Sequence, residues 1–496
     1  MKNIKDEIHS VLKEIGPGKM SEVAYDTAWV ALLHDLDKNL SDNALTWLCE
    51  HQLQDGSWGV EKPFDYHDRV ISTLAAMVAL TKHGRRTKDR VQIERGLIAL
   101  EKITDKAFQK KMIDPDRATA GFEMLVPVLM SEAEKLGLVQ PQRETILGQL
   151  ADSRRIKLEL LNGHKINRYL SAAFCAEMAG FDGLDMLDID QLQESNGSIG
   201  HSPSATAYYL MHIKPEDNSA LAYLHKYATP NGGAVDLAPF EVFEANWVLW
   251  NFSLLGQWDQ ETMTLMCPWL DYLKKGWLPG KGIGLSTGYS VPDGDDTSFT
   301  YDVLARFGMA PDIETVLSYE EKDRFRTFHY ELNSSNSVNI HMLDALRAGG
   351  MSAESSSAQK ILTHLQKVRK KNTYWYDKWH ISPYYTTAHA IITCAGYANH
   401  VVQPAIQWII ETQRKDGSWG FQFSSAEETA YCLQALYIWK QHAGKVSKSV
   451  LKNGTDWLKD HSEPPYPPLW LGKGLFTADV IVRSAVLSAL LLAEKG

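Results

Sequence analysis

Apolar residues recur along most of the chain at the spacing of an α-helix. In the segment 67–84, Val70, Leu74, Met77 and Val78 fall at i, i+4, i+7 and i+8, and a glycine stands at the end. The same spacing recurs in the segments 122–136, 427–439 and 481–492. Alternation with a period of two, which is typical of strands, is hard to find. The pattern therefore predicts an all-α chain.

One sequence template occurs twice in full. TWLCEHQLQDGSWG (46–59) and QWIIETQRKDGSWG (407–420) share the pattern Trp-aliphatic-x3-Gln-x3-Gly-Ser-Trp-Gly, and DIDQLQESNGSIG (188–200) is a worn copy with Ile199 in place of the second tryptophan. In each copy we expect a helix to end, Asp-Gly to make the turn, and Trp to pack back while Gln bonds exposed backbone groups. The template predicts two related helical domains built from stacked helix pairs, and we assign it no chemistry.

Composition and charge exclude several classes of protein. The 496 residues exceed one ordinary domain, and 44% hydrophobic with 23% charged residues is typical of a globular protein with a large core. The net charge of −10 and the lack of a basic block argue against nucleic-acid binding. No apolar run reaches the roughly 18 residues of a membrane span. Five scattered cysteines without a CxxC pair predict reduced thiols, and with the charged N-terminus they indicate a cytoplasmic protein.

Three aspartates stand within four residues in VPDGDDTSFTYDVLARFG (291–308), directly before a helical apolar pattern. The stretch lacks the alternating ligands of an EF-hand, and a plain N-cap would need only one aspartate. The arrangement would also suit a Brønsted acid, for two physical reasons. Neighbouring carboxylates raise the pKa of one member, and the helix N-terminus stabilises the anion that remains after proton donation. A calcium loop, an N-cap and an acid all stay open at this point.

The chain resembles the bacterial class II diterpene cyclases. DGDDT (293–297) fits their DxDD motif and the tryptophan template fits their QW motif, while HDRVISTLAA, NGSIGHSPSATAYY, DKWHISPYYTTAH and EPPYPPLWLGK look like segments of the same enzymes. The halimadienyl (tuberculosinyl) and kolavenyl diphosphate synthases are similar to this chain in length and in the sequence of these segments. The resemblance implies two α/α-barrel domains of the βγ type with the active site between them. We expect a γ-type domain at 16–268 and a β-type domain at 1–15 plus 269–496, with the boundary just before the turn cluster GWLPGKGIG (276–284).

The implied activity is proton-initiated cyclisation of geranylgeranyl diphosphate, with the diphosphate retained. By the resemblance Asp295 is the general acid, and Asp293 and Asp296 tune and hold it. Asn339 matches an asparagine that hydrogen-bonds the acid, and Ser335 is expected to assist. The alternative for Asn339 is a satisfied polar group inside a helix.

Alkene protonation creates a carbocation, which needs a dry cavity whose aromatic faces attract positive charge. Our candidates for these aromatic side chains are Trp375, Trp379, Tyr384 and Tyr385, although any of them could be ordinary core. For the diphosphate, the resemblance implies Mg²⁺ as cofactor with Asp114 and Asp116 as ligands, and Lys165 nearby. A solvated turn and a surface lysine are the alternatives.

Two departures shape the expected product. In the plant enzymes of this family that make the ent-copalyl skeleton, a histidine and an asparagine bind water. The segments that carry this pair read Ala173-Phe174-Cys175 and Val235-Asp236-Leu237 here. Without early deprotonation, hydride and methyl shifts would give a halimane or clerodane skeleton, and Asp236 is either a late base near the substrate or a capping residue. The chain contains no DDxxD motif, which ionisation-type (class I) cyclases need, so the product should keep its diphosphate.

Other functions stay open. Farnesyl diphosphate cyclisation to a drimane, or copalyl diphosphate synthesis, would use the same acid, and a non-catalytic helical-repeat scaffold would not need it. The expected partners are the geranylgeranyl diphosphate substrate and a downstream class I terpene synthase or phosphatase that takes the product. A homodimer is compatible with the resemblance, whereas nucleic acid and stable membrane insertion are not expected.

Overall fold

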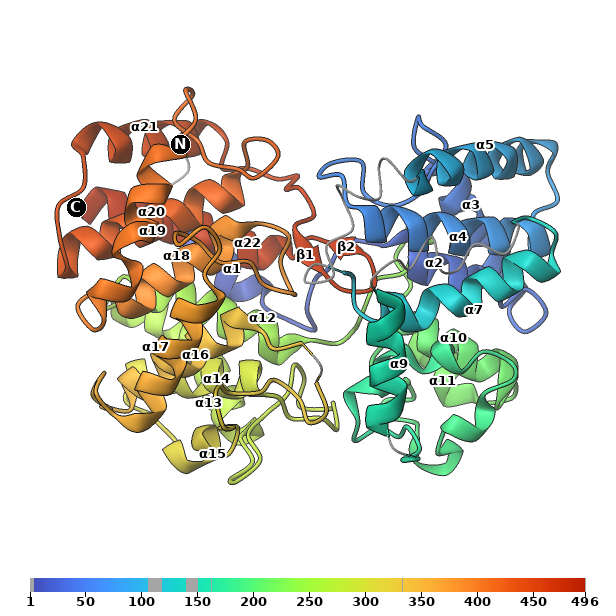
Figure 1. Cartoon of the computed structure of the whole chain (residues 1–496), viewed down its shortest axis with the longest axis horizontal. Coiled ribbons are helices and arrows are strands. Elements are labelled where there is room, and N and C mark those ends of the chain that lie inside the picture. Colours follow the sequence, from blue (N-terminus) through green and yellow to red (C-terminus); the bar gives the residue numbers. More distant parts are fainter. Residues whose placement is uncertain (1–3, 106–117, 140–149, 162, 332, 496) are drawn as a thin grey trace.

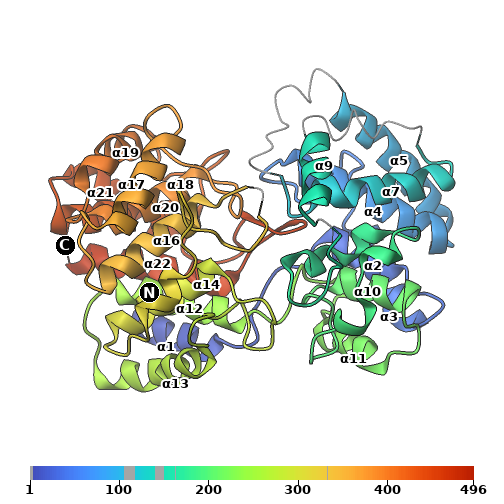
Figure 2. The ribbon, with the colours of Figure 1, turned by 60° about the horizontal axis from the view of Figure 1, so that its bottom comes forward.

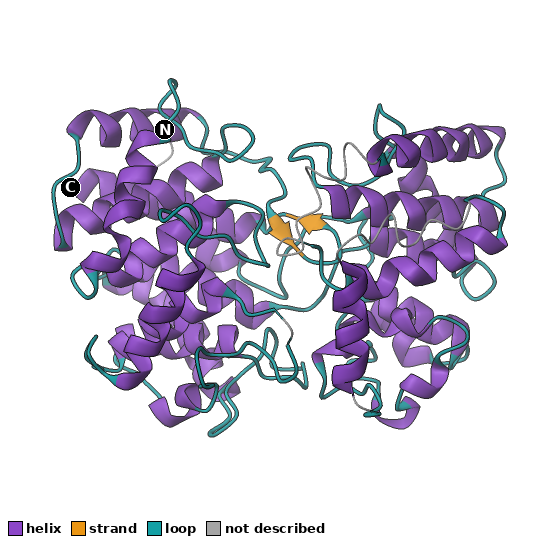
Figure 3. Cartoon of the chain, in the orientation of Figure 1, coloured by secondary structure: helices purple, strands orange, loops and turns teal. Residues whose placement is uncertain are grey.

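Two lobes of helices make up the protein (Figure 1). The computed structural model describes residues 4–105, 118–139, 150–161, 163–331 and 333–495. Within these ranges the only strands are β1 (Trp470–Leu471) and β2 (Leu475–Phe476), which pair antiparallel in a short hairpin. Figure 3 shows this hairpin between the lobes, and Figure 2 shows the same separation from another side. The expected all-α fold is confirmed.

The lobe on the right of Figure 1 is a barrel of helices from the first half of the chain. Its elements are α2 (Ala24–Ala31), α3 (Lys38–Glu50), α4 (Tyr66–His83), α5 (Thr87–Thr104), α7 (Phe122–Lys135), α9 (Leu150–Leu161), η2 (Ser171–Ala179), η3 (Leu184–Met186), η4 (Ile189–Gln191), α10 (Pro203–His212) and α11 (Asn218–Tyr227). Elements α2, α4, α7, η2 and α10 contact one another in sequence, and α10 returns to α2. They form the inner ring, and α3, α5, α9 and α11 pack outside it.

The second barrel contains the first helix and all helices after residue 240. They are α1 (Ile4–Glu14), α12 (Glu241–Ser253), α13 (Gln260–Gly276), α14 (Gly294–Arg306), α15 (Ile313–Leu317), α16 (Asn336–Ala348), α17 (Ser356–Val368), α18 (Pro383–Cys394), α19 (Asn399–Glu411), α20 (Ala426–His442), α21 (Lys448–Asp460) and α22 (Asp479–Lys495). The inner ring runs α12, α14, α16, α18, α20 and α22, which closes on α12. Inner and outer helices differ in how much of their surface is buried. Every residue of the inner helix α18 is buried, whereas α21 on the outside buries one stripe.

The two hydrophobic cores divide the chain earlier than expected. One core uses residues between Ala24 and Ala234, and the other uses residues between Ile8 and Val23 and from Val242 onward. The predicted boundary at residue 268 would assign α12 to the first barrel. Instead α12 lies between α14 and α22 and completes the second ring, because its apolar residues extend around the whole helix and need neighbours on every side. The turn cluster at 276–284 joins α13 to α14 inside the second barrel.

The repeated template is a helix-to-helix tie, as its residues indicate. The indole N–H of Trp58 donates to the carbonyl oxygen of Leu48, and that of Trp419 donates to Ile409, both at 2.7 Å. The amide of Gln413 bonds the carbonyl oxygens of Gly417 and Val450, at 2.8 and 2.9 Å. Each tie therefore fixes the end of one helix to the backbone of the next, and it contains no reactive group.

The β1–β2 hairpin belongs to the second barrel but is anchored in the first. The ammonium of Lys473, in the loop between the strands, is fully buried and lies 2.6 Å from Oε1 of Glu177. It also donates to the hydroxyls of Ser202 and Ser204, each at 2.7 Å. The backbone N–H of Lys473 donates to Asp236 at 2.9 Å. The hairpin thus joins the barrels through a buried cation.

Candidate active site

The three aspartates lie at the N-terminus of α14, on the side of the second barrel that faces the first. Asp293 is the N-cap, and its carboxylate accepts the backbone N–H of Asp296 at 2.9 Å. Gly294 has to be glycine, because a Cβ there would lie 2.3 Å from the carbonyl oxygen of Arg326. Asp295 follows in the first turn, where unpaired backbone N–H groups favour a carboxylate.

All three aspartates line the space between the barrels, and Asp295 is the most exposed of them. Asp293 and Asp296 are buried, whereas 15% of the Asp295 side chain is exposed. Burial, together with the charge of Asp295, raises the pKa of Asp293 to about 7. Burial and both neighbours raise the pKa of Asp296 well above its usual value. Asp293 and Asp296 therefore retain protons near neutral pH, and Asp295 is the member of the cluster placed closest to a bound substrate.

A histidine, rather than the expected asparagine, contacts the candidate acid. Nδ1 of His341, on α16, lies 2.5 Å from Oδ1 of Asp295. Asn339 instead bonds the backbone N–H and carbonyl oxygen of Phe325 at 2.9 and 3.0 Å. Ser335 is the N-cap of α16 and donates to Asp377 at 2.8 Å. Both expectations fail because α16 turns position 341, two residues beyond 339, toward α14.

Aromatic side chains from both barrels enclose the cavity in front of Asp295. The lining residues are Met20, Ala120, Phe174, Asp236, Leu237, Phe240, Phe243, Leu285, Asp293, Asp295, Asp296, Thr327, Phe328, Trp379, Tyr385, Trp470, Leu471, Gly472 and Phe476. Apart from the aspartates and one threonine, the walls are apolar. Such a cavity keeps bulk water away and presents π faces to a cation without a strong nucleophile.

Two of the four predicted aromatic residues line this cavity and two do not. Trp379 and Tyr385 are in its walls. Trp375 is fully buried and donates its indole N–H to the carbonyl oxygen of Leu365 at 2.7 Å, the same bond to the residue ten positions earlier that Trp58 and Trp419 make. It is a third tie of the repeated kind. Tyr384 stacks on Trp408, with ring centroids 4.8 Å apart, and lies outside the walls.

A wider cavity, called the outer cavity, adjoins this chamber. It shares Phe174, Phe328 and Trp379 with the inner cavity, so the two form one cleft between the barrels. Two lysines line the outer part, one from each barrel. Lys157 pairs with Glu123, and Lys378 lies 3.0 Å from Glu331. The inner part of the cleft is therefore acidic and aromatic, while the outer part, called the mouth, presents two ammonium groups that are each paired with a carboxylate.

Three residues were predicted to bind the diphosphate or its Mg²⁺, namely Lys165, Asp114 and Asp116. Lys165 is exposed and is not in the walls of either part of the cleft, so Lys157 and Lys378 replace it as the lysines of the mouth. Lys378 belongs to the DKWH segment quoted for the family resemblance, so the sequence could have indicated it as a binding residue. Asp114 and Asp116 lie outside the described residues. Among the residues that are described, no group of three or more His, Cys, Asp or Glu side chains could hold a metal ion.

Asp236 lines the inner chamber and is fully buried. One oxygen accepts the backbone N–H of Lys473 at 2.9 Å. Burial raises its pKa to about 6 against the opposing charge of Lys473. Asp236 is therefore part of the hairpin anchor as well as a wall of the chamber.

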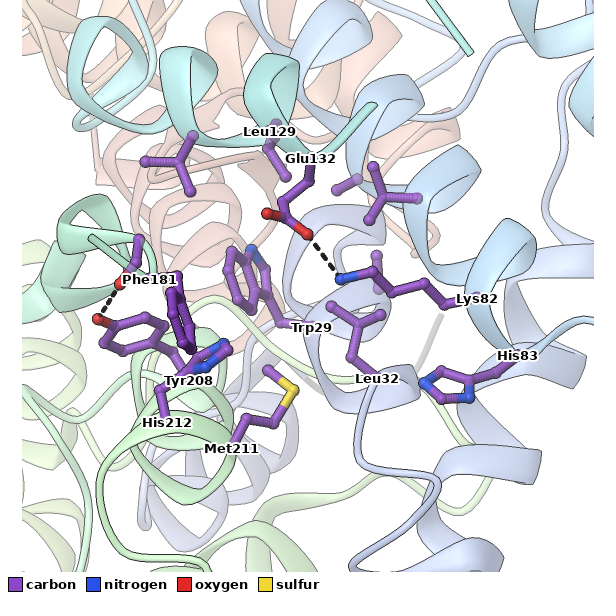
Figure 4. A pocket seen from close by; sticks show the side chains of 15 residues that line it. Trp29, Leu32, Lys82, His83, Leu129, Glu132, Phe181, Tyr208, Met211 and His212 are labelled. Atoms are coloured by element: carbon purple, nitrogen blue, oxygen red, sulfur yellow. Dashed lines mark hydrogen bonds and ion pairs between the residues drawn. The ribbon is translucent and has the colours of Figure 1, made fainter. Parts of the chain in front are cut away.

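A separate apolar cavity lies inside the first barrel (Figure 4). Trp29, Leu129 and Tyr208 are in its walls, and the ion pair between Lys82 and Glu132 closes one side at 2.8 Å. It shares no residue with the cleft that contains Asp295. None of the predicted site residues lies in it.

Comparison with known proteins identifies the family. The chain is 46% identical to the type B diterpene cyclase of Mycobacterium tuberculosis over 483 residues, which cover 96% of each chain. The chain belongs to the class II diterpene cyclases. Residues 331–465 of this cyclase match the family model of the squalene-hopene cyclase C-terminal domain.

Two copalyl diphosphate synthases are more distant relatives of this cyclase. It is 28% identical to the ent-copalyl diphosphate synthase of a Streptomyces species, over 90% of this chain and 88% of that one. The solved structure of ent-copalyl diphosphate synthase from Streptomyces platensis superposes with a TM-score of 0.79 at 26% identity, over 99% of both chains. The two-barrel architecture is thus that of known class II cyclases. No helix within the described ranges is both long and apolar enough to cross a bilayer.

Proposed function

We propose that this cyclase converts geranylgeranyl diphosphate to a bicyclic diterpenyl diphosphate of the halimane or clerodane type. The observation that carries the proposal is the position of Asp295, the most exposed carboxyl of its cluster, in a chamber with aromatic walls. The names of its relatives support a C20 substrate, because they are diterpene cyclases and copalyl diphosphate synthases.

The cleft suggests how the substrate lies. The hydrocarbon tail fits the inner chamber with its terminal alkene at Asp295, and the diphosphate fits the mouth between Lys157 and Lys378. The proton on Asp295 adds to the terminal alkene carbon, and the carboxylate that remains is stabilised by the N-terminus of α14. Ring closure then moves the positive charge along the chain between aromatic faces, which include Trp379, Tyr385 and Trp470.

Mg²⁺ is part of the proposal on the basis of the sequence. It would neutralise diphosphate charge at the mouth, with Asp114 and Asp116 as its ligands. Chelation by EDTA should raise KM more than it lowers kcat. The double variant Asp114→Asn/Asp116→Asn should reproduce this effect, and an unchanged KM in both cases would remove Mg²⁺ from the proposal.

The product decides between the alternatives. Purified enzyme is incubated with geranylgeranyl diphosphate, the products are treated with phosphatase, and the alcohols are identified by mass spectrometry and NMR. A halimane or clerodane alcohol is expected only after phosphatase treatment. Copalol would overturn the skeleton, and free hydrocarbon without phosphatase would overturn retention of the diphosphate. Faster turnover of farnesyl diphosphate would favour the drimane alternative.

A further inference from the structure

The contact between His341 and Asp295 is unexpected for an acid catalyst. An imidazole has an ordinary pKa of about 6.5 and an aspartic acid about 3.9, so a proton shared between them normally resides on the histidine. The 2.5 Å contact would then be an imidazolium–carboxylate pair, and Asp295 would have no proton to give. Something must keep His341 neutral if Asp295 is the acid.

A second histidine occupies the other nitrogen of His341. Nδ1 of His389, on α18, lies 3.2 Å from Nε2 of His341. The His389 ring is fully buried and stacks on Trp250, with centroids 4.5 Å apart and planes 15° from parallel. Stacking fixes the plane of the ring, and within this plane Nδ1 faces His341. Nε2 of His389 has no hydrogen-bond partner.

The unpaired nitrogen indicates which tautomer His389 adopts. A buried N–H without an acceptor is rare in proteins, whereas an unpaired acceptor is tolerated more often. The proton of neutral His389 therefore belongs on Nδ1, where it is donated to Nε2 of His341. His341 then carries its own proton on Nδ1 and donates it to Oδ1 of Asp295.

We propose that His389 is a positioning residue that holds His341 neutral and so keeps the catalytic proton on Asp295. Protonation of His341 would have to occur at Nε2, where the N–H of His389 already points. The proton on the free oxygen of Asp295 then has one destination, the substrate alkene. The O–H bond breaks as the new C–H bond forms, and the N–H of His341 stays on the other oxygen of the carboxylate.

The surroundings of His389 favour its neutral form. The titratable side chains around it are His341 on α16, His380 before α18, Tyr385 on α18 and Tyr431 on α20, and Trp247 and Trp250 of α12 complete the shell. Burial lowers the pKa of His389 well below its usual value, with help from the other two histidines.

Three substitutions at one position test the proposal, which rests on the proposed function of Asp295. His389→Asn keeps a donor at the place of Nδ1, His389→Phe keeps a ring on Trp250 without a donor, and His389→Asp offers only an acceptor. We expect His389→Asn to retain the rate and pH profile within about threefold. His389→Phe should lower kcat at pH 7 by about tenfold or more and move the alkaline limb down by about one pH unit, with KM unchanged. His389→Asp should be the least active.

A purely structural role would give a different pattern, in which kcat falls equally at every pH. Equal activity of the Asn and Phe variants, or an unshifted alkaline limb in the Phe variant, would overturn the proposal. Tyr431→Phe is the matched control, because it keeps a ring beside His389 and removes only a hydroxyl bonded to Glu427. It should leave the pH profile unchanged.

A second measurement is independent of activity. In ¹⁵N-histidine-labelled wild-type protein at pH 7, NMR should show His341 and His389 both neutral and both protonated on Nδ1. An imidazolium signal for His341 would overturn the proposal even if the His389 variants do not fold. If wild-type enzyme fails to turn over geranylgeranyl diphosphate, the proposed function fails, but the NMR result still decides the protonation of this pair.

Discussion

At the scale of single residues, the acid cluster separates two tasks among three chemically identical side chains. Asp293 caps the helix and Asp296 is buried behind it, while Asp295 is the member most exposed to the chamber. Asp295→Asn keeps the shape and removes the transferable proton. We expect it to lower kcat at least about a thousandfold with an unchanged melting temperature. Asp271→Asn, exposed on α13, is the control, and near-normal turnover by Asp295→Asn would refute the acid assignment.

The pH dependence of turnover follows from the same cluster. The raised pKa of Asp293, about 7, means that this group is protonated below pH 7 and ionised above it. Above pH 7 the coupled cluster therefore binds one proton fewer, which lowers the fraction of enzyme that carries the proton needed by the reaction. We expect kcat to be constant near pH 6 and to fall above about pH 7. A profile measured from pH 5 to 9 that instead rises toward alkaline pH would contradict an acid-initiated reaction.

At the scale of elements, the glycine of the repeated tie can be tested directly. Gly417 has a φ of +96°, and a Cβ there would lie 2.4 Å from the carbonyl oxygen of Asn453. Gly417→Ala should therefore cost about 2 to 4 kcal/mol of stability, from backbone strain plus the clash. Gly308 has a φ of +73° with open space around it, so Gly308→Ala should cost only about 1 kcal/mol. Thermal unfolding compares them, and equal losses would show that the tie is unimportant.

The sequence indicated elements well and contacts between distant elements less well. The helices, the two full ties and the aspartates at a helix N-terminus could be predicted, because spacing and capping act within a few residues. His341 could not, because its contact with Asp295 depends on how α16 rotates against α14. The tie made by Trp375 lacks the Gln-x3-Gly-Ser pattern, so the sequence does not distinguish Trp375 from a cavity residue. The predicted position of the domain boundary differs from the structure for a related reason, since a turn cluster does not show which barrel a helix completes.

At the scale of the whole molecule, the buried hairpin cation holds the two barrels together. Lys473→Met would leave Glu177, Asp26 and Asp236 buried without their counter-charge. Breaking a buried pair in this way costs about 3 to 5 kcal/mol. Carboxyls whose folded pKa is raised stabilise the fold at low pH and lose that contribution as pH rises. The deficit should therefore be larger at pH 8 than at pH 5.5.

Chemical denaturation at both pH values measures this deficit. Lys448→Met, exposed on α21, is the control and should be neutral at each pH. If the loss in free energy of unfolding caused by Lys473→Met does not change with pH, the lysine does not act by neutralising these carboxylates. Turnover should fall with stability, because Gly472, beside the lysine, is in the wall of the chamber.

The hairpin also determines when the enzyme can become active during its synthesis. Residue 473 leaves the ribosome about 240 residues after the last core residue of the first barrel at 234, a delay of roughly 10 to 50 seconds. Until then the first barrel has its inward carboxyl groups but not the ammonium that compensates them. The reactive chamber therefore forms last, so a ribosome-bound chain already carries its acid but has no enclosed space in which to generate a carbocation.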